Sequence, residues 1–262
     1  MGSALALGWL QAGLAPAALQ IVEPDASTRN AWAGKGCACA AELAGIADWP
    51  APRALVLAVK PQKMSEVLAH APALIGAGTV VVSIAAGTTL ETLQTAFGAG
   101  VSIVRTMPNT PASVGRGATA LYATAAVPTA DRELAEGLLA TVGLTAWLSD
   151  EAQMHAVTAL SGGGPAYVFL LIETLARAGV KAGLPDDLAM ALARATVSGA
   201  GELARLSTEP AAVLRQNVTS PGGTTAEALA VLMAADGIQP LFDRAIDAAA
   251  ARSEALGRGA AA

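Results

Sequence analysis

The residues best suited to chemistry lie near the carboxyl end, in the run Thr219-Ser220-Pro221-Gly222-Gly223-Thr224-Thr225. Glycines and hydroxyl side chains there precede an apolar helical run that begins near Ala226. Such a turn leaves backbone N–H groups unpaired at a helix start, where they can bind a carboxylate or a phosphate. The run contains no Lys or Arg, so the helix dipole and the hydroxyl groups would bind the anion. The same residues are equally typical of a well-capped helix after a Pro-Gly turn.

Composition leaves room for a sizeable core and argues against nucleic acid as a partner. The chain has 262 residues, of which 53% are hydrophobic and 14% charged, enough for one large or two ordinary domains. A net charge of -5 and 3% aromatic residues provide neither a basic surface nor a base-stacking platform. Cys37 and Cys39 have no partner pair, so neither a disulfide framework nor a metal site is supported, and free thiols are typical of the cytoplasm.

The stretch from Met1 to Val22 has no charged side chain and is similar in composition to a secretory signal. It lacks a basic start, and Gly8, Gly13 and Pro16 interrupt it. A membrane span would need about 18 or more uninterrupted apolar residues. We therefore predict a buried helix, a turn and a strand here, in a protein without a membrane segment.

Strands and helices alternate up to about residue 148. We predict strands over residues 19–22, 54–59, 79–84 and 101–105, with two more near 118–122 and 145–148. Helices are predicted over residues 3–11 and 61–71, and a capping box from Thr88 to Glu91 opens another. Continuous apolar strands separated by helices are typical of a doubly wound, parallel α/β sheet.

After Ser149-Asp150-Glu151 the strand patterns end and only helical ones follow. These helices are predicted near residues 152–160, 166–182, 185–206, 211–217, 226–235 and 238–256. The sequence thus predicts a dinucleotide-binding domain over residues 1–148 and an all-helical domain over residues 149–262, each of ordinary domain size.

The dinucleotide-binding pattern is incomplete at its start. Such a fold begins with a strand, a Gly-x-Gly-x-x-Gly turn and a helix, and its second strand ends in an acid about 20 residues later. Gly2 suits the third glycine and Glu23 the ribose-binding acid. The first strand and the first two glycines are absent, so we expect a natural start upstream of Met1. Upstream codons that encode no apolar strand with Gly-x-Gly would contradict this expectation.

Six short motifs occur in an order that resembles one enzyme family. They are Met1-Gly2-Ser3-Ala4-Leu5, Ala58-Val59-Lys60-Pro61, Ser83-Ile84-Ala85-Ala86-Gly87, Met107-Pro108-Asn109-Thr110-Pro111, Ser161-Gly162-Gly163-Gly164-Pro165-Ala166-Tyr167 and Ser220-Pro221-Gly222-Gly223-Thr224-Thr225. The chain is similar to the pyrroline-5-carboxylate reductases over its whole length, apart from the missing start. The resemblance implies a Rossmann-like α/β domain without its first strand, followed by an all-helical dimerisation domain. It also implies hydride transfer from NADPH or NADH to 1-pyrroline-5-carboxylate to give L-proline, in a homodimer or a larger homo-oligomer built from dimers.

The resemblance further implies roles for single residues. The substrate carboxylate would be held by Ser220 and by the backbone N–H groups of Gly223 and Thr224, with an acid nearby. The substrate-binding residues are Ser220, Gly222, Gly223, Thr224, Thr225 and Glu151. Thr225 is the candidate catalytic residue, as the hydrogen-bond partner and proton donor of the ring nitrogen. Because a neutral threonine is a weak acid, it could instead orient the ring or relay a proton through water. The cofactor would be bound by Gly2, Glu23, Ala58, Val59, Lys60, Pro61, Ile84, Ala85, Ala86 and Asn217.

Several of these residues have equally good local interpretations. Lys60 could be an exposed turn lysine, Glu151 an acid at a helix start and Asn217 a C-cap. Asn109 could support the site or shape a turn. Gly163 stands where the family usually has a second serine, which removes a hydroxyl group near the site.

The acids after the second predicted strand bear on cofactor choice. Glu23 and Asp25 favour a free ribose 2′-hydroxyl and repel a 2′-phosphate, so we expect NADH to be preferred over NADPH. Arg29 could still pair with a phosphate. The rival interpretations are a related imine or 3-hydroxyacid-type reductase, and a non-catalytic helical dimer that binds proline or a nucleotide. The first usually needs a catalytic lysine, and no Lys lies between Ser149 and Val180.

Overall fold

The computed structural model describes residues 1–258. The chain divides into two units, residues 1–162 together with the chain from Ala250 onward, and Gly163–Ala249. The boundary that the sequence predicts after residue 148 is a different division, because helix α6 (Gln153–Val157) lies within the first unit.

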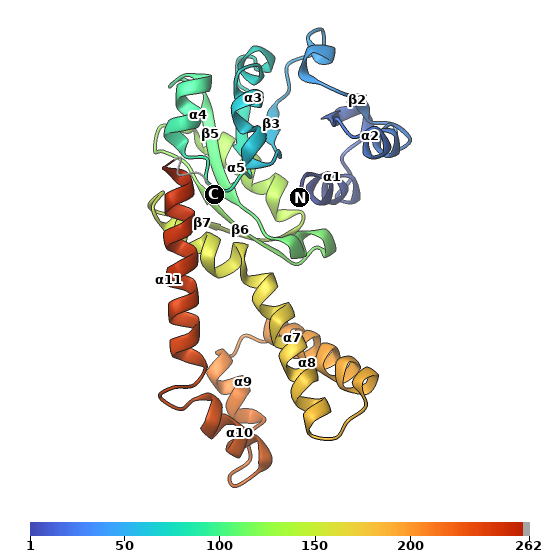
Figure 1. Cartoon of the computed structure of the whole chain (residues 1–262). Helices are drawn as coiled ribbons and strands as arrows, with labels where there is room; N and C mark the ends of the chain where they lie inside the picture. The colour runs from blue at the N-terminus through green and yellow to red at the C-terminus, as the bar shows by residue number, and fades with distance from the viewer. Residues whose placement is uncertain (259–262) are drawn as a thin grey trace. The chain divides into compact units, whose positions relative to one another are not determined.

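The first unit alternates strands with helices, as Figure 1 shows for the segments coloured blue to green. Its strands are β1 (Gln20–Val22), β2 (Ala38–Ala40), β3 (Ala54–Leu57), β4 (Val80–Ser83), β5 (Ser102–Met107), β6 (Gly117–Tyr122) and β7 (Gly143–Trp147). Its helices before α6 are α1 (Gly2–Gln11), α2 (Ala26–Ala33), α3 (Met64–Leu68), α4 (Leu90–Phe97) and α5 (Thr129–Ala140). The predicted helix, turn and strand over Met1–Val22 are therefore confirmed.

The strands form two sheets rather than one. Five strands are paired in the order β3-β4-β5-β6-β7, and β1 pairs with β2 in a separate parallel sheet. No strand of the described residues joins β1 to β3, which is where the first strand of a dinucleotide-binding fold would lie. All pairs are parallel except β5 with β6, so the predicted parallel sheet contains one antiparallel pair.

Strand β4 has an apolar core on each of its two faces. Val80 and Val82 pack in one cluster with Leu5 of α1 and Leu139 of α5. Val81 packs in the other, whose members come from α3 and α4 as well as from the sheet. Because successive strand residues point to opposite faces, helices are needed on both sides of β4. This arrangement confirms the doubly wound α/β class.

Two predicted helices differ from those observed, one in its extent and one in its N-cap. The helix expected over residues 61–71 is a 3₁₀ turn (Pro61–Lys63), the short helix α3 and a second 3₁₀ turn (Ala71–Leu74). The N-cap of α4 is Thr89, whose hydroxyl accepts the N–H of Thr92 at 3.2 Å, and not Thr88. Thr88 is buried, so its side chain is not at the exposed start of the helix.

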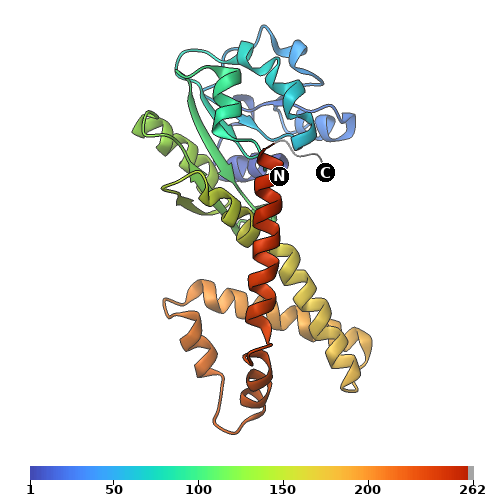
Figure 2. The same ribbon diagram turned by 60° about the vertical axis from the view of Figure 1, so that its left-hand side comes forward.

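The second unit is entirely helical, as predicted, and its helices are coloured yellow to orange-red in Figure 2. They are α7 (Gly164–Lys181), α8 (Asp186–Leu206), α9 (Ala211–Asn217), α10 (Thr224–Leu232) and most of α11 (Ile238–Gly257). Tyr167 of α7 meets Phe242 of α11 edge-to-face, with ring centroids 6.5 Å apart. Within residues 163–249 the buried side chains are Ala176, Ala189 and Ala193, all of them alanine.

Large apolar side chains of this unit are consequently exposed in the single chain, among them Phe169, Leu170 and Leu203. By length and composition, one helical run among the described residues (Gln153–Lys181) could cross a membrane. A contact between copies of the chain would account for the same exposed apolar surface. The single chain thus lacks a cover for this surface.

The carboxylate of Asp131 fastens α5 to the sheet. The Oδ1 atom of Asp131 lies 2.7 Å from Nη2 of Arg53, and its Oδ2 accepts the hydroxyl of Ser102 at 2.6 Å. The bonds from Ser102 and Arg53 lower the pKa of Asp131 below its ordinary value. A lowered folded-state pKa contributes stability that is present above the unfolded-state pKa and is lost as the pH falls through the folded-state pKa.

We expect Asp131→Asn to lower the free energy of unfolding by about 1–2 kcal/mol at pH 7, because two charge-assisted hydrogen bonds are weakened. The deficit should shrink at about pH 3, below the ordinary pKa of an aspartate, because the stability contributed by a lowered folded-state pKa is lost as the pH falls. Urea unfolding at both pH values, at one protein concentration, measures it. The exposed Asp48→Asn serves as the control, and an equal deficit at both pH values would refute the assignment.

Candidate active site

Most of the predicted cofactor residues lie at one edge of the five-stranded sheet. Strands β3 and β4 are parallel, with Leu57 in register with Ser83, so both end at the same edge. Residues 58–61 follow β3 and residues 84–86 follow β4. The crevice beyond the carboxyl ends of parallel strands is where doubly wound folds bind ligands. The topology therefore brings these two predicted segments together.

Gly2 joins this edge through the start of helix α1. A Cβ atom at Gly2 would lie 3.0 Å from Cβ of Ala58, closer than side chains normally approach. The helix start and the end of β3 can come this close because residue 2 has no side chain. This is the packing that the third glycine of a dinucleotide-binding turn provides, next to helix N–H groups that can face a phosphate.

Glu23 follows strand β1 and has a defined orientation. Its Oε1 accepts the N–H of Asp25 at 2.9 Å. Asp25 caps α2 by accepting the N–H of Thr28 at 2.8 Å, and this bond lowers the pKa of the Asp25 carboxyl. The guanidinium of Arg29 donates to the carbonyls of Glu23 and Pro24 at 2.8 and 3.0 Å. Two acids therefore stand at this strand end, and the nearby arginine is bonded to backbone oxygens.

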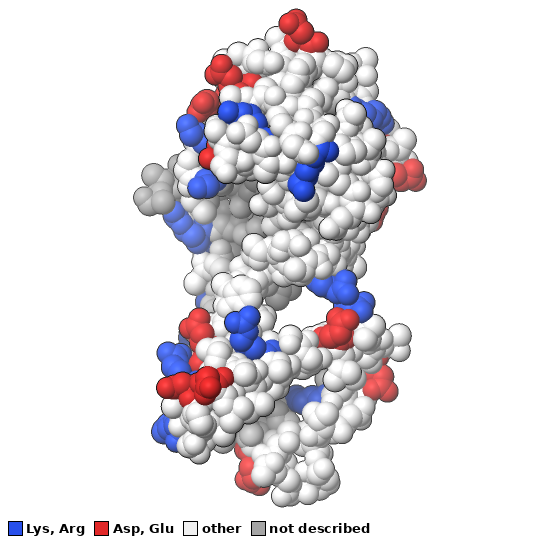
Figure 3. All heavy atoms as spheres, turned by 90° about the vertical axis from the view of Figure 1, so that its right-hand side faces the viewer, with Lys and Arg blue, Asp and Glu red and all other residues white. Residues whose placement is uncertain are grey.

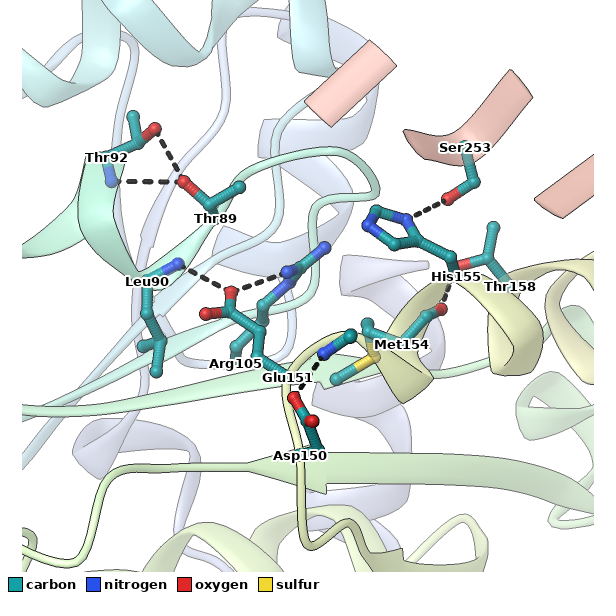
Figure 4. Close-up of polar contacts among 11 residues, drawn as sticks. Thr89, Leu90, Thr92, Arg105, Asp150, Glu151, Met154, His155, Thr158 and Ser253 are labelled. Atoms are coloured by element: carbon teal, nitrogen blue, oxygen red, sulfur yellow. Dashed lines mark hydrogen bonds and ion pairs between the residues drawn. The ribbon is translucent and has the colours of Figure 1, made fainter. Parts of the chain in front are cut away.

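An ion pair between a buried arginine and a half-buried glutamate lies at the centre of Figure 4. Nη1 of Arg105, on β5, lies 2.6 Å from Oε1 of Glu151, and the arginine side chain is only 3% exposed. The same carboxylate oxygen accepts the N–H of Leu90, the first residue of α4, at 2.8 Å. Glu151 thus neutralises a buried charge and caps a helix 61 residues earlier in the sequence. Its predicted contact with substrate stays a prediction.

Arg105 is not among the site residues predicted from sequence, although its strand carries a signal. It is the one charged residue in the otherwise apolar or hydroxyl-bearing strand Ser102–Met107. A charged residue on a buried strand requires an opposite charge nearby, because an isolated buried charge is strongly unfavourable. The sequence does not say which acid supplies that charge.

His155 is bonded to the end of helix α11, as Figure 4 shows. Its Nδ1 lies 3.0 Å from the hydroxyl of Ser253, which is buried. The last turn of α11 also approaches the β4–α4 loop, since a Cβ at Gly87 would lie 3.7 Å from Cβ of Leu256. This partner gives His155 a structural role in the first unit.

Asn109 connects three segments of the first unit. Its Nδ2 donates to the carbonyl of Ser161 at 3.1 Å, and its Oδ1 accepts the N–H of Ala118 at 2.8 Å. The side chain is buried, with 9% of its surface exposed. Of the two roles considered from sequence, these bonds correspond to the one that shapes the backbone.

The predicted carboxylate turn lies in the second unit. Gly222 has φ = +68°, a conformation that favours glycine, and α10 begins two residues later at Thr224. The N–H of Gly223, expected to bind the anion, instead donates to the carbonyl of Ser220 at 3.0 Å and closes the turn. Within the described part of the chain, the N–H groups of Thr224 and Thr225 have no acceptor. These two groups, with their exposed hydroxyls, are available to an anion.

Two other features of this turn qualify the site. Glu227 lies in the first turn of α10, where its negative charge opposes a bound anion. Asn217, predicted to contact the cofactor, donates its Nδ2 to Glu209 at 3.2 Å and ends α9 in the second unit. Its predicted contact with the cofactor stays a prediction.

Comparison with known proteins decides the family. A family model described as NADP oxidoreductase, coenzyme F420-dependent, matches residues 1–87, and one described as pyrroline-5-carboxylate reductase dimerisation matches residues 151–256. A pyrroline-5-carboxylate reductase of Pseudomonas aeruginosa is 43% identical over 95% of this chain and 91% of its own length. The chain belongs to the pyrroline-5-carboxylate reductase family.

Solved structures of pyrroline-5-carboxylate reductases have the same fold. One from Coxiella burnetii matches with a TM-score of 0.90 and 34% identity, covering 97% of this chain and 94% of its own. One from Plasmodium falciparum with NADP bound matches with a TM-score of 0.82 and 32% identity, covering 98% and 94%. The predicted fold class is confirmed: a Rossmann-like NAD(P)-binding domain followed by a helical dimerisation domain.

The buried ion pair gives a prediction about stability in this reductase. We expect Glu151→Ala to lower the free energy of unfolding by about 3 kcal/mol, because Arg105 is left buried without a counter-charge. Glu151→Gln keeps an acceptor for Leu90 and Arg105, so we expect about half that loss. Urea unfolding followed by circular dichroism measures both.

The control is Glu66→Ala, which removes the exposed ion pair between Lys63 and Glu66. It should cost less than about 0.5 kcal/mol. Similar losses in the Glu66 and Glu151 variants would show that burial of Arg105 is not what makes this pair important.

Proposed function

We infer that the chain reduces 1-pyrroline-5-carboxylate to L-proline with NADH or NADPH. The observation that carries this conclusion is 43% identity to a pyrroline-5-carboxylate reductase over 95% of the chain. A bound nicotinamide cofactor would supply the hydride for the imine carbon and be left as NAD+ or NADP+. A proton would be added to the ring nitrogen as the C=N π bond is broken. The hydride and the proton together account for the C–H and N–H bonds that the reduction forms.

The residues at the sheet edge fit a dinucleotide. Gly2 lets the start of α1 approach Ala58 closely and has no side chain to stand between the first N–H groups of the helix and a ligand. Ala58, Val59, Lys60 and Pro61, with Ile84, Ala85 and Ala86, would hold the ribose and nicotinamide. Glu23 would bind the adenosine ribose. Asn217 would add a contact from the helical unit.

The turn before α10 would hold the substrate carboxylate. Ser220 and the N–H groups of Thr224 and Thr225 provide the donors, and Gly222 and Gly223 provide the backbone path. Binding energy from the carboxylate can then orient the imine carbon toward the hydride. We propose that Thr225 bonds the ring nitrogen as it gains a proton, either as donor or through water. Glu151 is proposed to lie near the bound substrate as well as on Arg105.

Homo-oligomerisation and a small-molecule substrate agree with the dimerisation model over residues 151–256. We infer that the assembly is a homodimer or a larger ring of dimers, and that residues 149–262 act as the helical substrate and dimerisation domain. On the face shown in Figure 3, charged side chains are scattered and of both signs, which favours neither nucleic acid nor an anionic membrane as a partner. We infer a cytoplasmic location, because Cys37 and Cys39 are free thiols, which are typical of a reducing compartment.

Thr225→Ala tests the function and the mechanism together. We expect wild-type protein to oxidise NADH or NADPH when 1-pyrroline-5-carboxylate is added, and kcat to fall about 100-fold in the variant. The fold should be unchanged, because the Thr225 hydroxyl is exposed. Thr225→Ser should recover much of the rate, and Thr208→Ala, in the exposed loop before α9, is the control.

A wild-type rate in Thr225→Ala would remove this residue from the mechanism. Wild-type protein that binds a nucleotide or proline but oxidises no cofactor would favour the non-catalytic dimer. Activity with another imine or a 3-hydroxyacid, but not with the pyrroline, would favour the related reductases.

We propose that Glu23 makes NADH the preferred cofactor, because its charge repels a 2′-phosphate. Glu23→Gln keeps an oxygen for the N–H of Asp25 and removes the charge. The ratio of kcat/KM for NADPH to that for NADH should then rise about five- to tenfold. The exposed Glu42→Gln is the control, and a wild-type kcat/KM clearly higher with NADPH would refute the preference.

A further inference from the structure

The end of strand β4 has an unusual pair of buried hydroxyl groups. The register of β4 with β5 ends at Ser83 and Arg105, after which β5 continues alongside β6. The hydroxyl of Thr106, 1% exposed, donates to the carbonyl of Ser83 at 3.0 Å. A side-chain hydroxyl therefore donates to the last carbonyl of β4, at the point where the pairing of β4 with β5 ends.

Ser83 accepts a second hydrogen bond, at its side chain rather than at its carbonyl. Its hydroxyl is fully buried and accepts the N–H of Ala85 at 3.4 Å. The N–H of Ile84 donates to the carbonyl of Leu57 at 3.2 Å. Ser83, Ile84 and Ala85 are thus each held by a buried partner, while in the described part of the chain the N–H of Ala86 has none. The held segment stops where the chain becomes available to a ligand.

We propose that Thr106 and Ser83 are positioning residues for the cofactor: they fix the backbone of Ile84 and Ala85 against which the nicotinamide binds. This proposal rests on the proposed function, which places the cofactor at that segment. Neither hydroxyl needs to touch the cofactor. A buried hydrogen bond restricts the backbone more than an exposed one, because its donor and acceptor have no water to turn to.

The chain offers a matched control at the other end of the same strand. Thr79 is also buried, and its hydroxyl donates to the carbonyl of Pro52 at 2.6 Å and accepts the N–H of Gly76 at 3.1 Å. Thr79→Val and Thr106→Val make the same chemical change in the same sheet, but only Thr106 is next to the cofactor edge. A merely structural role predicts that both variants lose stability and keep their cofactor affinity.

The test measures the Kd of NADPH and of NADH by cofactor fluorescence, with the thermal midpoint and the KM for pyrroline-5-carboxylate. We expect Thr106→Val to raise the cofactor Kd about fivefold, because one buried hydrogen bond is lost. The KM for the substrate should change less. Thr106→Ser should restore it, and Thr79→Val should leave it unchanged. An unchanged Kd in Thr106→Val, or an equal shift in Thr79→Val, would overturn the proposal.

Ser83→Ala provides a second variant if Thr106→Val does not fold, and the same rise in Kd is expected because the N–H of Ala85 loses its acceptor. Wild-type protein must bind cofactor and reduce the pyrroline in the same experiment. If it does neither, the proposed function fails and this proposal fails with it. If wild type is active and both variants bind cofactor normally, this proposal alone fails.

Discussion

The architecture of the first unit depends on neutralising one buried charge. Arg105 lies inside the sheet domain, and a guanidinium cannot be left there without an acid. Glu151, from the segment after β7, supplies that acid with an N–O distance of 2.6 Å. Because Arg105 needs this acid, the segment that follows β7 must bring Glu151 back to β5 before α6 and the later helices begin.

The same carboxylate has a second consequence. By accepting the N–H of Leu90 it fixes the start of α4, and with it the end of the loop that leaves β4. The loop is thus restrained at its first residues by hydroxyl groups and at its far end by an ion pair. Its middle, at Ala86 and Gly87, is the part with the fewest internal bonds. A site that must hold a planar ring against backbone needs this combination of fixed ends and available groups.

Much of this could be predicted from local sequence. Buried strands are recognisable as apolar runs, and the limits of α9 were predicted to the residue from its helical pattern over residues 211–217. The residues at the sheet edge followed from knowing where each strand stops. Family motifs added roles that periodicity cannot provide.

What could not be predicted depends on contacts between distant residues. The cap of α4 comes from Glu151 and from Thr89, so the local box beginning at Thr88 was misplaced by one residue. The N–H of Gly223 was assigned to an anion because sequence does not reveal that the turn closes on the carbonyl of Ser220. The antiparallel pairing of β6 with β5 likewise leaves no mark on the apolar pattern of either strand.

The all-alanine interior of residues 163–249 has a consequence for how the protein folds. With three small side chains fully buried and many large apolar side chains exposed, these helices leave much apolar surface in water in the single chain. Covering this surface in a homo-oligomer, which the dimerisation model over these residues supports, adds to their stability. Folding and association become one equilibrium, so the thermal midpoint of this protein depends on how concentrated it is.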